Sequence, residues 1–263
     1  MSLPFYSATD DPGPSFAALL SKESLQPRYE VDSPYDAASI MHGTTVVAAR
    51  FADGVIIAGD RRATSGHLIS HRTMEKVFQA DRWSGVAISG AAGPAIEMVK
   101  LFQLQLEHYE KVEGHSLSLE GKANQLSQML RAHLPAAMQG MVVVPIFAGF
   151  DLRRGYGRLF AYDVTGGRYE EEDYVASGSG SLHARTVIRL GHRADISRDE
   201  CVDLLLKALF TAADEDSATG GPDSMRGIYP IISTISAEGY VEVPESEVAD
   251  RFAAIIAEFA GRA

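Results

Sequence analysis

The fold is decided by a short stretch of the chain, residues 44–62, which reads TTVVAARFADGVIIAGDRR. Two runs of β-branched and apolar residues, 44–51 and 55–58, flank the turn sequence Ala52-Asp53-Gly54. Apolar runs separated by a glycine-containing turn predict a strand, a turn and a second strand. We therefore expect a folded domain that begins at Thr44 with two strands.

The residues before Thr44 differ in character. Residues 1–43 hold five of the eleven prolines, many serines and aspartates, and little periodicity. Such a segment cannot easily bury enough apolar surface to fold alone. At most, residues 14–20 predict a short helix that docks on something else. The composition fits either a disordered tail or a removable leader, and the chemistry expected at Thr44 favours the leader.

The rest of the chain has strands in runs and helices in pairs. Apolar runs predict strands, and apolar residues at helical spacing predict helices. The expected strands after the first two are 76–79, 85–89, 142–150, 158–163, 169–176, 228–236 and 240–243. The expected helices are 94–111, 118–139, 181–191, 198–213 and 246–260. This order predicts an α+β domain over residues 44–263, with mostly antiparallel sheets covered by helices.

Composition narrows the partners. The net charge is −11, whereas binding to nucleic acid needs clustered Lys and Arg, so we expect no nucleic-acid partner. The single cysteine, Cys201, excludes an intrachain disulfide and favours a reducing compartment. Its apolar neighbours favour a packed thiol. We see no secretory signal and no run apolar enough to span a bilayer, so we expect a cytoplasmic protein without a membrane partner.

Several common catalytic motifs are absent from the sequence. There is no His-Glu-x-x-His, and the eight histidines are scattered, so a catalytic metal has little support. No Gly-x-Ser-x-Gly elbow and no Walker loop occurs, and the glycine-rich stretch 177–181 lacks dinucleotide spacing. We therefore expect no cofactor.

Thr44 stands where the leader ends and the first strand begins. A hydroxyl is a poor nucleophile until a base takes its proton. An N-terminal threonine carries its own candidate base, because the pKa of an α-amino group is about 7.7–8.0. Before cleavage that nitrogen is an amide, so residues 1–43 would keep the enzyme silent. Gly43 lacks a Cβ and permits the tight backbone geometry for self-cleavage between Gly43 and Thr44.

A carboxylate and a lysine follow in the sequence. Asp60 ends the second strand beside Arg61 and Arg62, and Lys76 opens the next apolar strand. Such a pair near a threonine hydroxyl would favour the deprotonated oxygen electrostatically. On these residues alone, an ordinary structural ion pair is the simpler interpretation.

Six short motifs together resemble the pattern of proteasome β-subunits, most of all the actinobacterial ones. Each is weak alone, but they occur in order and with suitable spacing between residue 44 and about residue 259. The motifs are Thr44-Thr45, Gly59-Asp60-Arg61-Arg62, Lys76, Ser89-Gly90, Gly178-Ser179-Gly180 and Asp216-Ser217-Ala218-Thr219-Gly220-Gly221. The resemblance implies an N-terminal-nucleophile (Ntn) hydrolase fold, a four-layer αββα sandwich with two mainly antiparallel sheets between helical layers.

The resemblance also implies roles for individual residues. Thr44 would be the nucleophile of a threonine protease and its freed amine the base. Asp60 and Lys76 would form the supporting pair, with Lys76 lowering the pKa of the hydroxyl. The Gly90 N–H would lie in the oxyanion hole. The residues that hydrogen-bond around the amine would be Ser179, Asp216 and Thr219, the last at a place where many relatives have serine.

The first specificity pocket can be placed only by resemblance. Its matching positions are all uncharged and, apart from one threonine, apolar, which suits cleavage after hydrophobic residues. Some of them could equally be core residues. They are Ala63, Thr64, Met74, Ile88, Ala92 and Ile96.

Partners are likewise implied by the family. The subunit would sit in stacked seven-membered rings, with two inner β-rings capped by rings of α-subunits. A ring-shaped ATPase would deliver unfolded proteins tagged with a small ubiquitin-like modifier.

Three alternatives remain open. The bacterial two-ring protease of the same superfamily also starts Thr-Thr, but it typically has Gly-Asp-Gly where this chain has Gly59-Asp60-Arg61. A non-catalytic ring-scaffold subunit would usually have lost the threonine or the lysine, and both Thr44 and Lys76 are present. A small-molecule amidase of the Ntn class would not be expected to match the remaining motifs.

Overall fold

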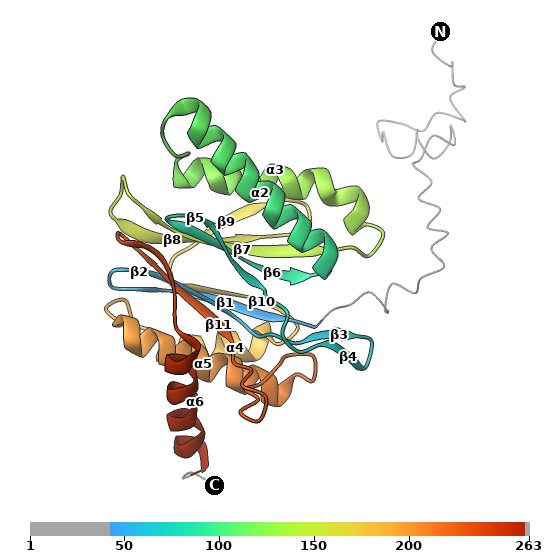
Figure 1. The fold of residues 1–263 in the computed structure, drawn as a ribbon, viewed down its shortest axis with the longest axis vertical. Helices are drawn as coiled ribbons and strands as arrows, with labels where there is room; N and C mark the ends of the chain where they lie inside the picture. Colours follow the sequence, from blue (N-terminus) through green and yellow to red (C-terminus); the bar gives the residue numbers. More distant parts are fainter. Residues whose placement is uncertain (1–42, 261–263) are drawn as a thin grey trace, which may run out of the picture. The chain divides into compact units, whose positions relative to one another are not determined.

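The computed structural model describes residues 43–260 (Figure 1). Residues 1–42, which include most of the expected leader and the short helix expected over residues 14–20, lie outside the described residues. The described chain forms two five-stranded antiparallel sheets and one small two-stranded sheet.

The first sheet is built around the stretch that opens the domain. β1 pairs with β10 on one side and with β2 on the other, and β2 also pairs with β11. Successive side chains of a strand point to opposite faces, and both faces of β1 and β2 are buried, which explains why these strands are apolar almost throughout. In sheet order the strands are β10 (Tyr174–Gly178), β1 (Thr45–Phe51), β2 (Gly54–Gly59), β11 (Ile231–Ser236) and β12 (Gly239–Glu242).

The second sheet packs face to face against the first. A shared apolar cluster joins them, with Val46 and Ile57 from the first sheet and Ile146 and Leu159 from the second. The strands of the second sheet are β5 (Val77–Asp81), β6 (Ser84–Gly90), β7 (Val143–Asp151), β8 (Tyr156–Tyr162) and β9 (Arg168–Glu171).

Helices cover the two outer faces, as Figure 1 shows. On the second sheet lie α2 (Ala92–Glu113) and α3 (Leu119–Ala137), and on the first lie α4 (Ser181–Gly191) and α5 (Arg198–Glu215). The last helix, α6 (Glu245–Ala260), packs against α5, where Phe252 meets Phe210. The resulting order of helices, sheet, sheet and helices confirms the four-layer αββα sandwich expected from the sequence. Among residues 43–260, no helix combines the length and apolar character needed to cross a bilayer.

Some element boundaries differ from the prediction. The hairpin of β3 (Ala63–Ser65) and β4 (Leu68–His71) was not expected, because β4 is exposed and carries no apolar pattern. β11 begins at Ile231 rather than at residue 228, since Pro230 lacks the N–H that a strand needs for its ladder. Lys76 precedes β5 instead of opening it.

Two local predictions agree with the structure. The expected capping box is present at the start of α5, where Ser197 and Glu200 each accept from the other's backbone N–H. Cys201 is buried among apolar residues, and this burial raises the pKa of its thiol to about 12. The thiol is therefore a packing group, as expected.

Candidate active site

The residues expected to carry the chemistry converge at one end of the first sheet. Gly43 and Thr44 immediately precede β1, and only 3% of Thr44 is exposed. The Thr44 carbonyl accepts from the Ser179 N–H at 2.8 Å, and the Asp60 N–H donates to the Thr45 carbonyl at 3.1 Å. The backbone around Thr44 is thus fixed from both neighbouring strands, because Ser179 follows β10 and Asp60 follows β2.

Asp60 and Lys76 form a buried ion pair beside this backbone. The Lys76 Nζ donates to Asp60 Oδ1 at 2.7 Å, and their side chains are 1% and 0% exposed. The same ammonium donates to the Arg62 carbonyl at 2.5 Å. Burial lowers the pKa of Lys76, and the charge of Asp60 offsets part of this effect. The pair therefore holds a positive charge close to the start of β1 in a place that water does not reach.

Asp60 is also fixed by backbone donors. Its Oδ1 accepts from the Thr45 N–H at 2.8 Å. Its Oδ2 accepts from the N–H groups of Arg62 at 2.9 Å and Gly220 at 2.8 Å. The carboxylate thus connects β1, the end of β2 and the loop after α5, and the three backbone donors fix its position.

Ser179, Asp216 and Thr219 form a second group on the other side of Thr44. The Ser179 hydroxyl donates to Asp216 Oδ2 at 2.5 Å, and the Thr219 hydroxyl donates to the same oxygen at 2.6 Å. Partial burial works to raise the pKa of Asp216, but these two hydrogen bonds and one from the Ala218 N–H hold it below its ordinary value. Ser179 Oγ lies 3.4 Å from the Thr44 nitrogen. Ser179 is thus the member of this group that contacts the Thr44 nitrogen, and Asp216 joins it to Thr219.

Gly43 is held in a position that only glycine can occupy. Its N–H donates to Thr64 Oγ1 at 2.9 Å. A Cβ on Gly43 would lie 1.9 Å from the Cβ of Ala218 and 2.7 Å from its Cα. Any larger residue would therefore displace the bond between positions 43 and 44.

Gly90 lies at the end of β6 with φ of +99°, where a Cβ would be 2.2 Å from the Val142 carbonyl oxygen. The preceding residue connects the two sheets, since Ser89 Oγ is 2.8 Å from Ser177 Oγ on β10. This contact brings Gly90 to the same end of the sandwich as the Thr44 group. Among the described residues, no hydrogen bond joins Gly90 directly to Thr44.

The six positions assigned to the specificity pocket divide into two sets. Met74, Ile88 and Ile96 pack in the apolar cluster between α2, α3 and the second sheet. The others, Ala63, Thr64 and Ala92, are outside that cluster, and Thr64 contacts Gly43 as described above. The structure thus brings Thr64 next to Gly43, while Ile88, only 2% exposed, lies among the core residues.

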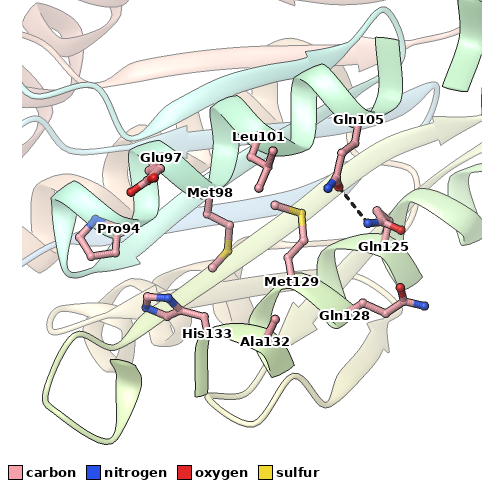
Figure 2. A pocket seen from close by; sticks show the side chains of 10 residues that line it. All are labelled: Pro94, Glu97, Met98, Leu101, Gln105, Gln125, Gln128, Met129, Ala132 and His133. Carbon is pink, nitrogen blue, oxygen red and sulfur yellow. Dashed lines mark hydrogen bonds between the residues drawn. The ribbon is translucent and has the colours of Figure 1, made fainter. Parts of the chain in front are cut away.

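A separate groove of about 490 Å³ lies between α2 and α3 (Figure 2). Met98 and Met129 face each other across it, and a hydrogen bond of 2.8 Å between Gln105 and Gln125 spans one end. None of the expected catalytic or pocket residues lines this groove. The lining residues are Pro94, Glu97, Met98, Leu101, Gln105, Gln125, Gln128, Met129, Ala132 and His133.

One residue of the site was given no role by the sequence. Thr45 is fully buried, and its Oγ1 lies 2.6 Å from Thr219 Oγ1. The repeated threonine in the Thr44-Thr45 motif was the available signal.

For metals, the part of the chain that the structure describes holds no group of three His, Cys, Asp or Glu side chains placed to bind an ion.

Two antiparallel sheets packed between helical layers, with a threonine at the head of a central strand, define the Ntn-hydrolase class. The sequence matches the family model described as "Proteasome subunit" over residues 40–226. A curated relative from Acidimicrobium ferrooxidans, named "Proteasome subunit beta", is 55% identical over 248 residues, which cover 94% of this chain and 91% of the relative.

Two further relatives carry the same name. The protein from Streptomyces griseus is 56% identical over 80% of this chain and 75% of its own length. The protein from Jonesia denitrificans is 51% identical over 90% of this chain and 80% of its own length. The chain therefore belongs to the proteasome subunit family, among the β-subunits, whose members assemble into rings with other subunits.

Proposed function

We propose that this β-subunit is catalytic: a threonine-type endopeptidase whose nucleophile is Thr44, exposed when the chain cleaves its own Gly43–Thr44 bond. The observation that carries the proposal is the placement of the buried Asp60–Lys76 pair on one side of Thr44 and the Ser179–Asp216 pair on the other.

Self-cleavage would begin with addition of Thr44 Oγ1 to the Gly43 carbonyl carbon. The C–N bond then breaks, the nitrogen takes up a proton, and the leader is held as an ester on the threonine. Water hydrolyses this ester, which releases the leader with a terminal carboxylate and restores the hydroxyl. The close packing of Gly43 on Ala218 and its hydrogen bond to Thr64 support this step, because they fix the carbonyl before the reaction.

Peptide hydrolysis would use the same atoms with one addition, the free amine of Thr44. This amine takes the hydroxyl proton as the oxygen attacks a substrate carbonyl. An ammonium has three N–H groups; Asp60 and Arg62 accept from two of those on Lys76, which leaves the third for the threonine oxygen. The Gly90 N–H would stabilise the oxyanion. The substrate C–N bond then breaks, the Thr44 ammonium gives the proton to the leaving amine, and water hydrolyses the acyl-enzyme ester that remains.

The substrate and the cellular setting are further parts of the proposal. The positions assigned to the specificity pocket are uncharged, which suits peptides with a hydrophobic residue before the cleaved bond. They are Ala63, Thr64, Met74, Ile88, Ala92 and Ile96. We infer a cytoplasmic particle in which heptameric β-rings are capped by α-subunit rings and supplied by a ring-shaped ATPase. The β-subunit names of the relatives support the core-particle assignment.

The alternative of a two-ring bacterial protease has less support. Arg61 stands where that protease typically has glycine, and Arg62 is the next residue. Both arginine side chains form hydrogen bonds with other loops: Arg61 donates to the Thr73 carbonyl at 3.1 Å, and Arg62 donates to the Ser217 carbonyl at 2.9 Å.

The test is the fate of the leader. The wild-type chain should yield a product that begins at Thr44, seen by intact mass and N-terminal sequencing, and this product should hydrolyse peptides. Thr44→Ala should remain full length and inactive, because it has no nucleophile. Thr186→Ala is the matched control: this threonine is exposed on α4 and bonds only within that helix, so processing should continue. Normal processing of Thr44→Ala would refute the assignment.

A further inference from the structure

Thr45 is a buried polar residue that the catalytic roles above do not use. Its side chain is 0% exposed, in a position where an apolar residue would ordinarily be expected on a central strand. Its hydroxyl has two partners: Thr219 Oγ1 at 2.6 Å and the Gly180 N–H, which donates to it at 3.0 Å. Both partners are adjacent to residues that surround the Thr44 nitrogen.

The direction of each hydrogen bond in this group can be worked out. An ionised carboxylate only accepts, and a hydroxyl has one proton to donate. Thr219 gives its proton to Asp216 at 2.6 Å, so Thr219 must accept from the Thr45 hydroxyl. Thr45 then accepts from the Gly180 N–H. Every proton between Gly180 and Asp216 is therefore assigned.

The same reasoning fixes Ser179. Its proton is committed to Asp216 at 2.5 Å, so its oxygen can only accept from the Thr44 nitrogen. The 3.3 Å approach of Ser179 Oγ to the Thr44 carbonyl is then a contact without a proton, and that carbonyl already accepts from the Ser179 N–H. After cleavage, the Thr44 amine would donate to Ser179 and keep its lone pair for the hydroxyl proton.

We propose that Thr45 is a positioning residue for this site: its hydroxyl closes a ring of hydrogen bonds through Thr219, Asp216, Ser179 and Gly180, and thereby orients the Ser179 oxygen toward the Thr44 nitrogen. The inference rests on the proposed catalytic function. Ser179 and Gly180 are joined by one peptide bond, which closes the ring. Thr45 therefore acts on Ser179 by two routes, through Thr219 and Asp216 to its side chain and through the Gly180 N–H to its backbone.

The space around the ring is consistent with this role. A Cβ on Gly180 would lie 2.5 Å from Thr45 Oγ1 and 2.7 Å from Thr219 Oγ1. Contacts below 3 Å of this kind require atoms to shift, so a methyl group at position 180 would separate the two hydroxyls. The glycine at position 180 thus provides a second, independent way to open the ring without removing any hydroxyl.

The first experiment compares Thr45→Val and Thr45→Ser in the full chain. Valine has nearly the shape of threonine but cannot donate a proton, whereas serine can. We expect Thr45→Val to release its leader about tenfold more slowly, and the processed material to show a similar fall in kcat with little change in KM. Thr45→Ser should restore both rates. Thr234→Val is the matched control, because Thr234 lies on β11 of the same sheet and, among the described residues, its hydroxyl bonds only to the Val241 carbonyl.

The second experiment is Gly180→Ala, which should lower the same two rates although all the hydroxyls remain. Wild-type rates in Thr45→Val or in Gly180→Ala would overturn the inference, and so would a Thr45→Ser variant as slow as Thr45→Val. An equal loss in Thr234→Val would also overturn it. If the wild-type chain itself never released the leader, the proposed function would fail and this inference with it. Active wild type beside fully active Thr45→Val would refute the inference alone.

Discussion

At the scale of a single residue, Lys76 shows how the fold prepares a charged group. Its ammonium is removed from water and meets one carboxylate, Asp60, and one carbonyl, that of Arg62. Burial lowers its pKa, so the folded protein tolerates the positive charge less easily than water does. A nearby oxygen that carries negative charge would relieve this cost, which is the property that a nucleophilic threonine needs.

Lys76→Ala should abolish this effect. Asp60 would keep its three backbone donors but lose its cation, and the threonine hydroxyl would lose its electrostatic support. We expect the leader to remain attached, or peptide hydrolysis to fall by about 10²- to 10⁴-fold. Both are measured by intact mass and by cleavage of a fluorogenic peptide.

Lys122→Ala is the matched control for Lys76. Lys122 on α3 is also buried and forms an ion pair with Asp81 at the end of β5, away from Thr44. Its loss should lower stability and leave processing intact. Should Lys76→Ala process at the normal rate, the role given to Lys76 would be wrong.

The residue types of the site were readable from sequence, but their contacts were not. The motifs predicted the candidate site residues, and the structure brings Asp60 together with Lys76 and Ser179 together with Asp216. The partners of Thr45 lie 135 and 174 positions away in the chain. No local pattern reports such a pairing, because it depends on how α5 and β10 pack beside β1.

At the scale of elements, clear apolar patterns predicted most strands and helices, although the single strand expected over residues 169–176 is two strands, β9 and β10, in different sheets. The short exposed hairpin β3–β4 was not predicted. Its residues are mostly exposed, so burial does not impose an alternating pattern on the sequence. A backbone hydrogen bond of 3.0 Å from Met74 to the Arg61 carbonyl joins the two ends of the hairpin. Such an element depends on tertiary contacts, which a pattern-based reading does not detect.

One ionic network connects four elements. Arg158 on β8 is 2% exposed and donates to Glu170 through two hydrogen bonds of 2.6 Å. It also donates to Glu120 on α3 at 2.7 Å and to Asp151 at the end of β7 at 3.1 Å. The guanidinium therefore joins the outer helical layer to three strands of the second sheet.

Arg158→Met should destabilise the fold, because three carboxylates would lose their shared cation. Breaking a buried pair typically costs about 3–5 kcal/mol, and we expect the lower end since Glu120 and Glu170 are partly exposed. Urea unfolding of the full chain measures the loss. Lys111→Ala, which breaks an exposed pair with Glu107 on α2, should leave the unfolding midpoint unchanged. Equal midpoints for Arg158→Met and the wild type would contradict this prediction.

The pH dependence of this network has a definite sign. Hydrogen bonds from Arg158 hold the pKa of Glu170 below its ordinary value of 4.5. A carboxyl with a lowered pKa in the folded state stabilises the fold fully above its ordinary pKa, and this stability is lost as the pH falls through the lowered value. The stability difference between wild type and Arg158→Met should therefore shrink below pH 4.5.

At the scale of the whole molecule, the two sheets approach each other closely where Gly157 faces Gly54. A Cβ on Gly157 of β8 would lie 2.6 Å from the Gly54 carbonyl carbon on β2 and 2.6 Å from Val55 Cγ1. These atoms belong to the facing sheet, so a side chain at position 157 would have to push the two sheets apart.

Gly157→Ala should lower the free energy of unfolding by about 1–3 kcal/mol, the usual cost of adding a methyl group to a packed interior. Urea denaturation of the full chain provides the measurement. Gly93→Ala is the control, because a Cβ there meets no atom within 4 Å and the residue lies in the first turn of α2. A Gly157→Ala variant as stable as wild type would mean that the sheets can separate freely.

The site draws its parts from places that only a finished fold brings together: the head of β1, the end of β2, the turn after β10 and the end of α5. On the proposed mechanism, this dispersion keeps an incompletely folded chain inactive. A nascent or misfolded chain lacks the cation beside its threonine and cannot release the amine that serves as the base, so it stays inert however much of it accumulates. Peptidase activity would appear only in molecules that have already folded completely.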